Sequence, residues 1–376
     1  MINGDWSSDV CSSDLDDPIV SKFQKPSVQC FHGGQSYRTC KNFKCDFSVT
    51  TNLSGPPKSG VEAALKAFDE IEHYPDQESW EVRCHFADIW KISPEEILLG
   101  NGASEFIDIV PRLFPRGTKW RPGPWGAQFM EYERAATNAG LIKVPWEDNT
   151  APVTIMINPN SPTGDYIPFE EFRKLIAKDE KSTFVIDESF ISCLGPNWMY
   201  QSAARLISEF GDRVIIICSW TKVLACPLMR IGTVVSTKSV INRIAKLQVP
   251  WSVNGFAQAF MIASLHDENY FNEMWRVTPI WKKNIQDLCK EVGFKVNENS
   301  PLCVPFVYVD MLTDEIAKEA EKTAYEAGYP IRLCTSFGKP HNVRLGVRIP
   351  EHAKGLQQSW LNNPHLMQMI KEYYSK

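Results

Sequence analysis

The chain has 376 residues, which is enough for one large domain or two moderate ones. Hydrophobic residues make up 43% and charged residues 23%, an ordinary globular balance, and the net charge of −5 gives no reason to expect nucleic acid or an anionic membrane as a partner. The eleven cysteines lack the paired spacing of a zinc site, so we expect no metal. Several lie in apolar runs, so we expect a reducing, cytoplasmic compartment.

The first fifteen residues differ in composition from the rest. Residues 4–15 read GDWSSDVCSSDL, which resembles the conceptual translation of a short-read sequencing adapter. The alternative is a native Ser/Asp-rich tail. In either case the stretch lacks the basic start and the apolar run of a signal peptide. We expect a non-native tail at 1–15 and an N-terminal arm at 16–45 that packs with a smaller domain.

Helix-like and strand-like segments alternate through most of the chain. Helical periodicity occurs at 61–72, 104–113, 168–177 and 201–210, and apolar runs typical of buried strands occur at 153–157, 183–186, 214–218 and 231–236. This alternation predicts a mostly parallel sheet covered on both faces.

The pattern changes near residue 272. A long helix is predicted at 273–292, then a strand at 304–309, a helix, and a strand at 343–348. The sequence therefore predicts an α/β protein with a large domain at 46–271 and a smaller α+β domain at 272–376.

A lysine segment follows the predicted strand at 214–218. It reads S-W-T-K-V-L-A-C-P-L-M-R-I-G from Ser219 to Gly232. Lys222 can form an imine with an aldehyde cofactor, and Ser219 and Arg230 are close enough in sequence to hold a cofactor phosphate. The S-x-x-K part alone is also compatible with a solvated loop lysine, whereas the spacing to Arg-x-Gly is more specific.

This segment resembles the lysine motif of fold-type I enzymes that depend on pyridoxal 5′-phosphate (PLP), the class I/II aminotransferase superfamily. N-P-N-S-P-T-G at 158–164 and V-I-D-E-S-F at 185–190 resemble two further motifs of that superfamily, in the same order. The resemblance extends from about His32 to the C-terminus. It implies the aspartate-aminotransferase fold, PLP as cofactor, and an enzyme.

The resemblance also implies roles in cofactor binding. Asp187 pairs with the pyridine nitrogen and keeps the ring an electron sink, and Asn158 bonds the phenolic oxygen. The run G-N-G-A-S-E opens a predicted helix, whose first residues, Ala103 and Ser104, can hold the phosphate, although an ordinary turn is the alternative.

Two aromatic residues compete to stack on the cofactor ring. Phe129 aligns with the aromatic of the superfamily's P-T-F-x-E-Y pattern, but the usual proline is missing, and Trp125 follows a proline. We choose Phe129. Tyr74, in His-Tyr-Pro-Asp, resembles a tyrosine that reaches the cofactor of the other subunit, which implies a homodimer.

A narrower resemblance is to the threonine-phosphate decarboxylases of cobalamin side-chain synthesis. It is carried by F-H-G-G-Q at 31–35, D-F-S-V-T-T-N-L-S-G-P-P at 46–57, P-W-S-V-N at 250–254, and two arginine segments at 331–337 and 343–348. Gln35, residues 49–51 and a short loop at 336–342 depart from that family's pattern.

A phosphorylated amino acid presents a carboxylate and a dianion, both of which arginine binds well. We assign Arg344 to the carboxylate and Arg332 with His32 to the phosphate, and we expect Gly33 and Asn158 to contact the substrate as well. Arg348 is expected to be exposed or structural.

The preferred hypothesis is a decarboxylase of a phosphorylated amino acid. The alternative is an aminotransferase similar to histidinol-phosphate aminotransferase, and a third hypothesis is a PLP-fold protein that binds ligand without turnover.

Overall fold

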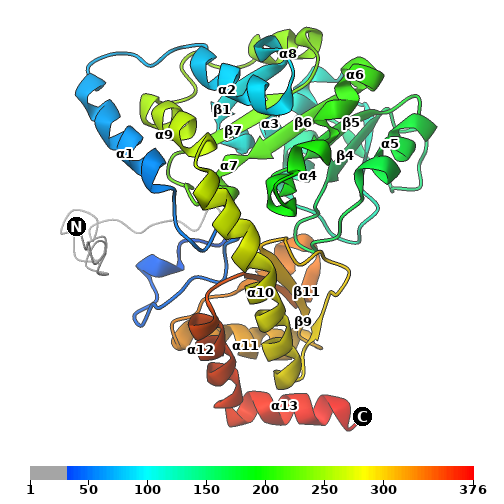
Figure 1. Ribbon diagram of the computed structural model, residues 1–376. Coiled ribbons are helices and arrows are strands. Elements are labelled where there is room, and N and C mark those ends of the chain that lie inside the picture. The colour runs from blue at the N-terminus through cyan, green and yellow to red at the C-terminus, as the bar shows by residue number, and fades with distance from the viewer. Residues whose placement is uncertain (1–31) are drawn as a thin grey trace, which may run out of the picture.

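A computed structural model describes residues 32–376, which form two sheet-containing parts joined by one long helix (Figure 1). The expected tail at 1–15 and residues 16–31 of the expected arm lie outside the described residues. Between residues 32 and 376, no helix is both long enough and apolar enough to span a membrane.

The larger sheet has seven strands in the order β1-β7-β6-β5-β4-β2-β3. Strands β6, β5, β4, β2 and β3 run parallel, whereas β7 is antiparallel to both β6 and β1. The prediction of a mostly parallel sheet is therefore confirmed. The strands span Ile97–Asn101 (β1), Lys119–Pro122 (β2), Ile142–Lys143 (β3), Val153–Ile157 (β4), Thr183–Asp187 (β5), Val214–Ser219 (β6) and Ile231–Val235 (β7).

Helices cover both faces of this sheet, because its strand side chains alternate between two apolar cores. Ile155 and Val185 belong to one core, with α3, α4 and α8, whereas the next residues along the strands, Met156 and Ile186, belong to the other, with α2, α5 and α9. The helices are Lys58–Lys66 (α1, packed on α9), Trp80–Trp90 (α2), Ala103–Ile109 (α3), Glu131–Asn138 (α4), Phe169–Lys178 (α5), Ile207–Phe210 (α6), Trp220–Val223 (α7), Lys238–Ala245 (α8) and Gly255–Leu265 (α9).

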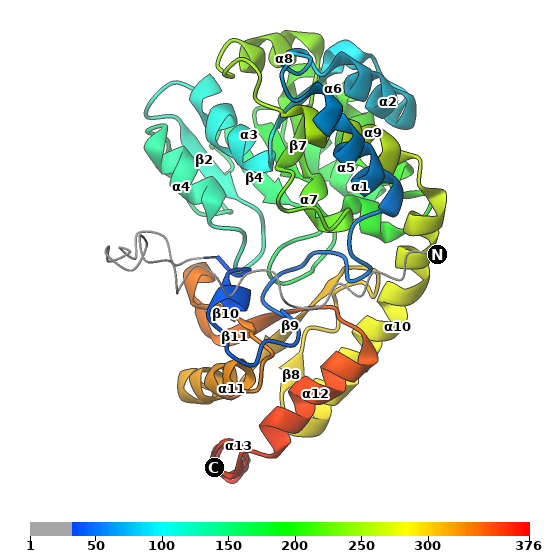
Figure 2. The same ribbon diagram turned by 90° about the vertical axis from the view of Figure 1, so that its left-hand side faces the viewer.

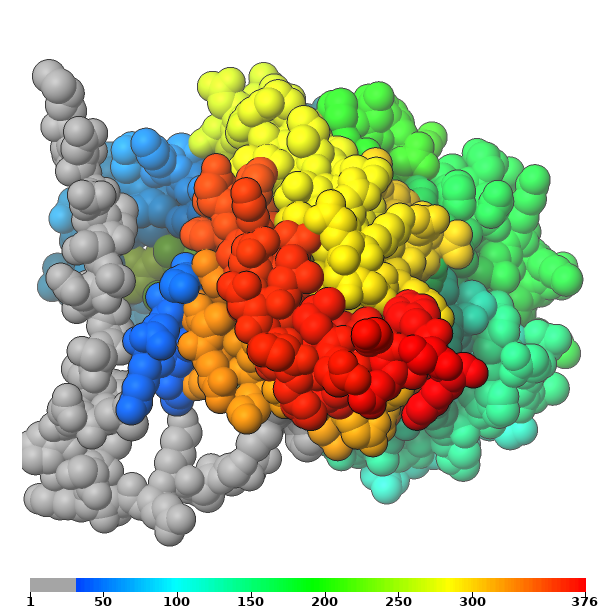
Figure 3. Space-filling view, turned by 90° about the horizontal axis from the view of Figure 1, so that it is seen from below, coloured from blue at the N-terminus to red at the C-terminus, as the bar shows by residue number. Residues whose placement is uncertain are grey.

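The smaller sheet is antiparallel, with the strand order β10-β11-β9-β8. Its strands span Lys295–Val296 (β8), Phe306–Asp310 (β9), Arg332–Cys334 (β10) and Lys339–Gly346 (β11). Helices Asp314–Glu326 (α11), Pro350–Leu361 (α12) and Pro364–Tyr374 (α13) complete this part. Figure 3 shows the orange-red and red helices α12 and α13 beside the yellow helix α10, Glu268–Val292.

Helix α10 runs from one core into the other. Phe271 and Met274 near its start belong to the core of the large sheet, and Ile285 and Cys289 belong to the core of the small sheet. The domain boundary expected between residues 271 and 272 therefore falls inside α10. The helix begins five residues earlier than predicted because the side chain of Asp267 caps it, accepting a hydrogen bond from the backbone N–H of Tyr270 at 3.1 Å.

The described part of the N-terminal arm packs on the smaller domain (Figure 2). The backbone N–H groups of Lys44 and Phe47 donate to the carbonyls of Gly328 and Pro330, at 2.8 and 2.9 Å, and the Tyr325 hydroxyl bonds Thr39 Oγ1 at 2.8 Å. The arm is therefore hydrogen-bonded to the segment that follows α11 before the chain enters the large domain.

Most predicted elements are present with shifted ends, and some of the predicted helices are only partly α-helical. The segment 201–210 forms a 3-10 turn at Ala203–Leu206 and then the single turn of α6. Helix α3 stops at Ile109 because Pro111 has no N–H to continue the helical hydrogen bonds, and a 3-10 turn follows. Strand β11 begins at Lys339 and ends at Gly346, so Arg348 lies beyond it.

Candidate active site

A cavity of about 540 Å³ lies where the two parts meet. The carboxyl ends of β4, β5 and β6, the start of α3 and strand β11 all reach it, the usual ligand position of an open α/β sheet. Most of the predicted site residues line it: His32, Gly33, Ala103, Ser104, Phe129, Asp187, Ser219, Lys222, Arg230 and Arg344.

Lys222 occupies the short helix α7, directly after β6. Burial lowers the pKa of its amine from 10.5 to about 8, with further lowering by the positive charges of Arg344 and Arg230 and an opposing effect of Asp187. An amine with a pKa near 8 is partly neutral at physiological pH. Lys222 is therefore available as a nucleophile toward an aldehyde.

Asp187 ends β5 and is 5% exposed. Its carboxylate accepts hydrogen bonds from the Tyr132 hydroxyl and the Ser189 backbone N–H, both at 2.8 Å. Burial raises the pKa of this carboxyl, and those hydrogen bonds and Lys222 partly oppose the effect. A cationic group placed against Asp187 would therefore find a fixed, desolvated anion.

We name the start of α3 together with Arg230 the anion-binding corner, because its backbone amides and guanidinium could hold a phosphate. Gly102 precedes the helix, and Arg230 Nη2 donates to Ser104 Oγ at 3.2 Å. A Cβ atom at Gly102 would lie 2.3 Å from Arg230 Nη2, and one at Gly232 would lie 2.3 Å from the Ala103 backbone nitrogen. Both glycines are thus required for the close approach of backbone amides and guanidinium.

Arg332 and Arg344 face each other on neighbouring strands. They are direct cross-strand partners of β10 and β11. Arg344 donates to Ser161 Oγ at 3.0 Å and to the Ser48 carbonyl at 3.3 Å, and its Nε is buried without a partner among residues 32–376. Burial lowers the pKa of Arg344 to about 10, so the group stays cationic at neutral pH.

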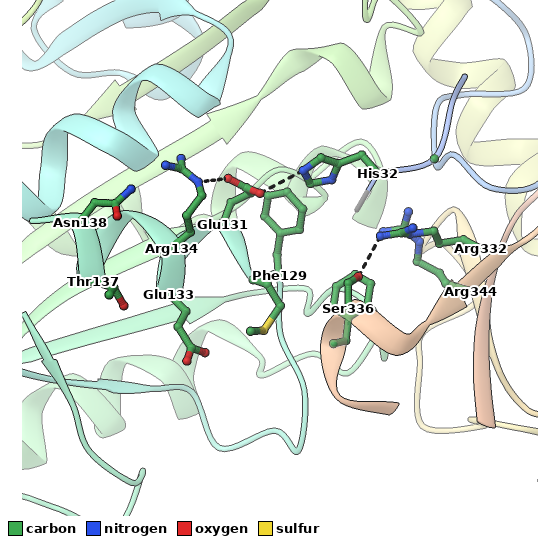
Figure 4. Close-up of a pocket in the computed structure, with 13 residues that line it drawn as sticks. His32, Phe129, Glu131, Glu133, Arg134, Thr137, Asn138, Arg332, Ser336 and Arg344 are labelled. Atoms are coloured by element: carbon green, nitrogen blue, oxygen red, sulfur yellow. Dashed lines mark hydrogen bonds and ion pairs between the residues drawn. The ribbon is translucent and has the colours of Figure 1, made fainter. Parts of the chain in front are cut away.

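A second cavity of about 420 Å³ adjoins the first and shares six of its lining residues, among them His32, Phe129 and Arg344. The Arg332 side chain lines this outer cavity. Within the described chain, the one hydrogen bond of its guanidinium goes from Nη2 to Ser336 Oγ at 2.8 Å (Figure 4). Together the two cavities leave space for a substrate next to the cofactor.

Asn158 does not line either cavity. It is 3% exposed, and its amide is occupied by the Ile167 main chain: Nδ2 donates to the Ile167 carbonyl at 2.9 Å, and Oδ1 accepts from the Ile167 N–H at 2.8 Å. In place of Asn158, Ser161 from the same loop lines the larger cavity and accepts from Arg344. The expected contact from Asn158 to the cofactor is therefore not supported by the geometry.

Other expected residues are distributed as follows. Phe129 lines both cavities, whereas its competitor Trp125 packs against the core of the large sheet. Tyr74 is 81% exposed, packs against Trp251 with tilted rings whose centres lie 4.9 Å apart, and lines neither cavity of its own chain. Arg348 is buried and donates to the carbonyls of Asp46, Val49 and Thr51, which makes it structural and not exposed.

Several residues of the site were not predicted from the sequence, notably Ser161, Tyr132 and Glu131. Ser161 lies inside the N-P-N-S-P-T-G segment, and Tyr132 and Glu131 lie inside the segment quoted for Phe129. The motifs therefore contained the signal. Only the folded chain shows that Tyr132 reaches Asp187 across 55 positions.

The cavity fits the expected cofactor on independent grounds. A buried amine, a buried carboxylate and an anion-binding corner stand around one space, which also holds the Phe129 ring. These groups match the aldehyde, the ring nitrogen and the phosphate of PLP, with an aromatic to stack on its ring.

Comparison with known proteins agrees with this arrangement. The family model "Aminotransferase class I and II" matches residues 44–353. The chain is 25% identical over 365 residues to the adenosylcobalamin biosynthesis bifunctional protein CobDQ of Leptospira interrogans, a match that covers 88% of this chain and 41% of that protein.

Two solved structures share the fold. The histidinol-phosphate aminotransferase of Sinorhizobium meliloti, in complex with PLP, matches with a TM-score of 0.78 and 19% identity, covering 94% of this chain and 98% of its own. The L-threonine-O-3-phosphate decarboxylase of Porphyromonas gingivalis matches with a TM-score of 0.73 and 20% identity, covering 89% and 100%. The chain belongs to the class I and II aminotransferase family, and it is a fold-type I PLP-dependent enzyme.

Proposed function

We propose that this enzyme decarboxylates a phosphorylated amino acid, with Lys222 holding PLP, Arg344 binding the substrate carboxylate and Arg332 binding the distal phosphate. The observation that carries the proposal is the Arg332–Arg344 pair. Like charges directly opposite each other on neighbouring strands repel. Neither guanidinium has a carboxylate within 4 Å in the described chain, and two anions on one substrate would satisfy both.

Bound PLP supplies an electron sink for whichever bond at the substrate Cα breaks. The residues of this chain choose that bond by fixing two ends of the substrate. Arg344 fixes the carboxylate and Arg332 the distal phosphate, so rotation about the bond to the substrate nitrogen is restricted. In this proposal Lys222 Nζ would return a proton to Cα once CO₂ has left.

The alternative is transamination, for which Lys222 would move a proton at Cα and the carboxylate would stay. The likeness of fold to the histidinol-phosphate aminotransferase of S. meliloti favours it. The likeness to the P. gingivalis decarboxylase and to CobDQ, together with the segments that resemble threonine-phosphate decarboxylases, favours decarboxylation.

The two arginine roles can be tested by comparing two substrates. Arg332→Ala should lower kcat/KM for O-phospho-L-threonine by about ten- to several-hundred-fold, because a charge-assisted hydrogen bond contributes roughly 1.5–3 kcal/mol. It should change turnover of L-threonine little, since threonine has no dianion. Arg344→Ala should impair both substrates. Equal losses on both substrates for Arg332→Ala would show that its phosphate role is wrong.

A further inference from the structure

The imidazole of His32 lines both cavities and makes few contacts with the described chain. Its side chain is 50% exposed, and its one hydrogen bond within residues 32–376 joins Nε2 to Glu131 Oε1 at 3.0 Å. Its one contact with another aromatic ring in the described part of the chain is with Phe129, at 5.9 Å between ring centres. The direction of the imidazole therefore depends on Glu131 (Figure 4).

Glu131 itself is fixed from its own helix. It occupies the first turn of α4, where a carboxylate is favoured by the helix dipole, and its Oε2 accepts from Arg134 Nε at 2.5 Å. Arg134 in turn contacts Asp108 of α3 at 3.4 Å. The Glu131 carboxylate is thus held by contacts of its own, and it in turn orients the His32 imidazole.

The arm that carries His32 is fastened on its other side to the smaller domain. The backbone N–H of Gly34 donates to Ser48 Oγ at 3.0 Å, and the Ser48 carbonyl accepts from Arg344. The His32–Glu131 contact is therefore the hydrogen bond that ties this part of the arm to α4. Both residues line both cavities, and Arg332 lines the outer one.

We propose that Glu131 is a positioning residue, which holds the His32 imidazole over the outer cavity so that it meets the distal phosphate beside Arg332. This inference rests on the proposed function, because it needs a substrate with a distal phosphate. A partly exposed hydrogen bond between two side chains contributes little to folding stability. Its value to the enzyme is the restricted orientation of a substrate-binding ring.

The test is a double-mutant cycle on the PLP-loaded enzyme. Glu131→Ala should raise KM for O-phospho-L-threonine about tenfold, leave kcat within about twofold, and leave KM for L-threonine unchanged. In a His32→Asn background, Glu131→Ala should have no further effect, because its role passes through His32. Glu131→Gln should retain most of the wild-type KM, since its amide oxygen can still accept from Nε2.

Glu171→Gln is the matched control, since Glu171 is also an acid in the first turn of a large-domain helix, α5, and is exposed outside both cavities. Its KM and its melting temperature should equal those of wild type. The inference is overturned if Glu131→Ala leaves KM for phosphothreonine unchanged, raises KM equally for both substrates, or adds to His32→Asn. If wild type does not prefer phosphothreonine to threonine, the proposed function fails first and the inference fails with it.

Discussion

At the scale of single residues, the site depends on what burial does to Lys222 and Asp187. Desolvation destabilises the charged form of each side chain. It lowers the pKa of the Lys222 amine to about 8 and raises the pKa of the Asp187 carboxyl. Burial therefore costs free energy at both side chains. The cost at Lys222 is relieved when its amine reacts with an aldehyde, and the cost at Asp187 is relieved when a cationic ring nitrogen lies beside its carboxylate. The free site therefore favours loading with PLP.

The pKa of Lys222 predicts how cofactor capture depends on pH. Only the neutral amine attacks an aldehyde, and with a pKa near 8 about one tenth of it is neutral at pH 7. The rate at which apoenzyme captures PLP, followed by visible absorbance in a stopped-flow instrument, should rise several-fold from pH 7 to 8.5 and then level off. A rate that still rises nearly tenfold between pH 8 and pH 9 would mean an unshifted lysine.

Borohydride reduction of the loaded enzyme and peptide mapping should place the label on Lys222. Lys282 is an internal control, because it is also buried with a pKa lowered to about 7, but its amine donates to Ser300 Oγ at 2.6 Å and lies outside both cavities. A label on Lys282, or rapid turnover by Lys222→Ala, would refute the assignment.

At the scale of elements, strand β7 and helix α3 build the anion-binding corner together. The backbone of Gly232 in β7 passes so close to the start of α3 that any side chain would displace it. Close contact of this kind is expected where backbone amides must face a phosphate. The Arg-x-Gly spacing after Lys222 therefore has a packing reason as well as a chemical one.

Gly232→Ala should separate α3 from β7 and weaken PLP binding. Its Cβ would lie 2.3 Å from the Ala103 backbone nitrogen, so overpacking of roughly 1–3 kcal/mol is expected, with a lower melting temperature and a higher Kd for PLP. Gly255→Ala is the matched control, because the nearest atom lies at 3.7 Å and helix α9 favours alanine there. If both variants bind PLP like wild type, the corner does not depend on this contact.

The sequence predicted the buried elements better than the peripheral ones. Val153–Ile157 and Val214–Ser219 are mostly apolar, and runs of this kind are typical of central parallel strands. The two-residue β3 and the three-residue β10 have too few side chains to show a period, and β1 is antiparallel to β7 through a pairing distant in sequence. Local patterns cannot specify such pairings.

Part of the candidate site could also be predicted from the sequence, whereas the direction of its loop side chains could not. Resemblance to motifs led to Lys222, Asp187 and Arg344. All three line one cavity, with Lys222 directly after β6, Asp187 at the end of β5 and Arg344 inside β11. The Asn158 prediction failed in geometry because the loop turns that side chain toward Ile167 and presents Ser161 to the cavity. The direction of a loop side chain is set by tertiary contacts that spacing does not contain.

At the scale of the whole molecule, we propose a homodimer in which Tyr74 reaches the partner's cofactor. Tyr74 is 81% exposed although it contacts Trp251, and large apolar side chains nearby in the chain are also exposed, including Leu65, Phe68 and Ile71. Exposed apolar groups of this number are typical of interaction sites.

The dimer predicts a light-scattering mass of about twice the 42.8 kDa of the chain. Tyr74→Ala should keep that mass but raise the Kd for PLP, because the tyrosine would contact the phosphate of the other subunit. A strictly monomeric species with full activity would contradict the proposal, and an unchanged Kd in Tyr74→Ala would contradict the role of the tyrosine alone.

The central claim is that the two arginine groups orient a phosphorylated amino acid for loss of its carboxylate. The most direct measurement incubates the PLP-loaded enzyme with O-phospho-L-threonine and quantifies CO₂ and keto acid in the same reaction, with and without an added keto-acid acceptor. The proposal predicts CO₂ in amounts equal to the substrate consumed, with no requirement for the acceptor. Keto acid formed in place of CO₂, and only when the acceptor is present, would contradict it and establish transamination.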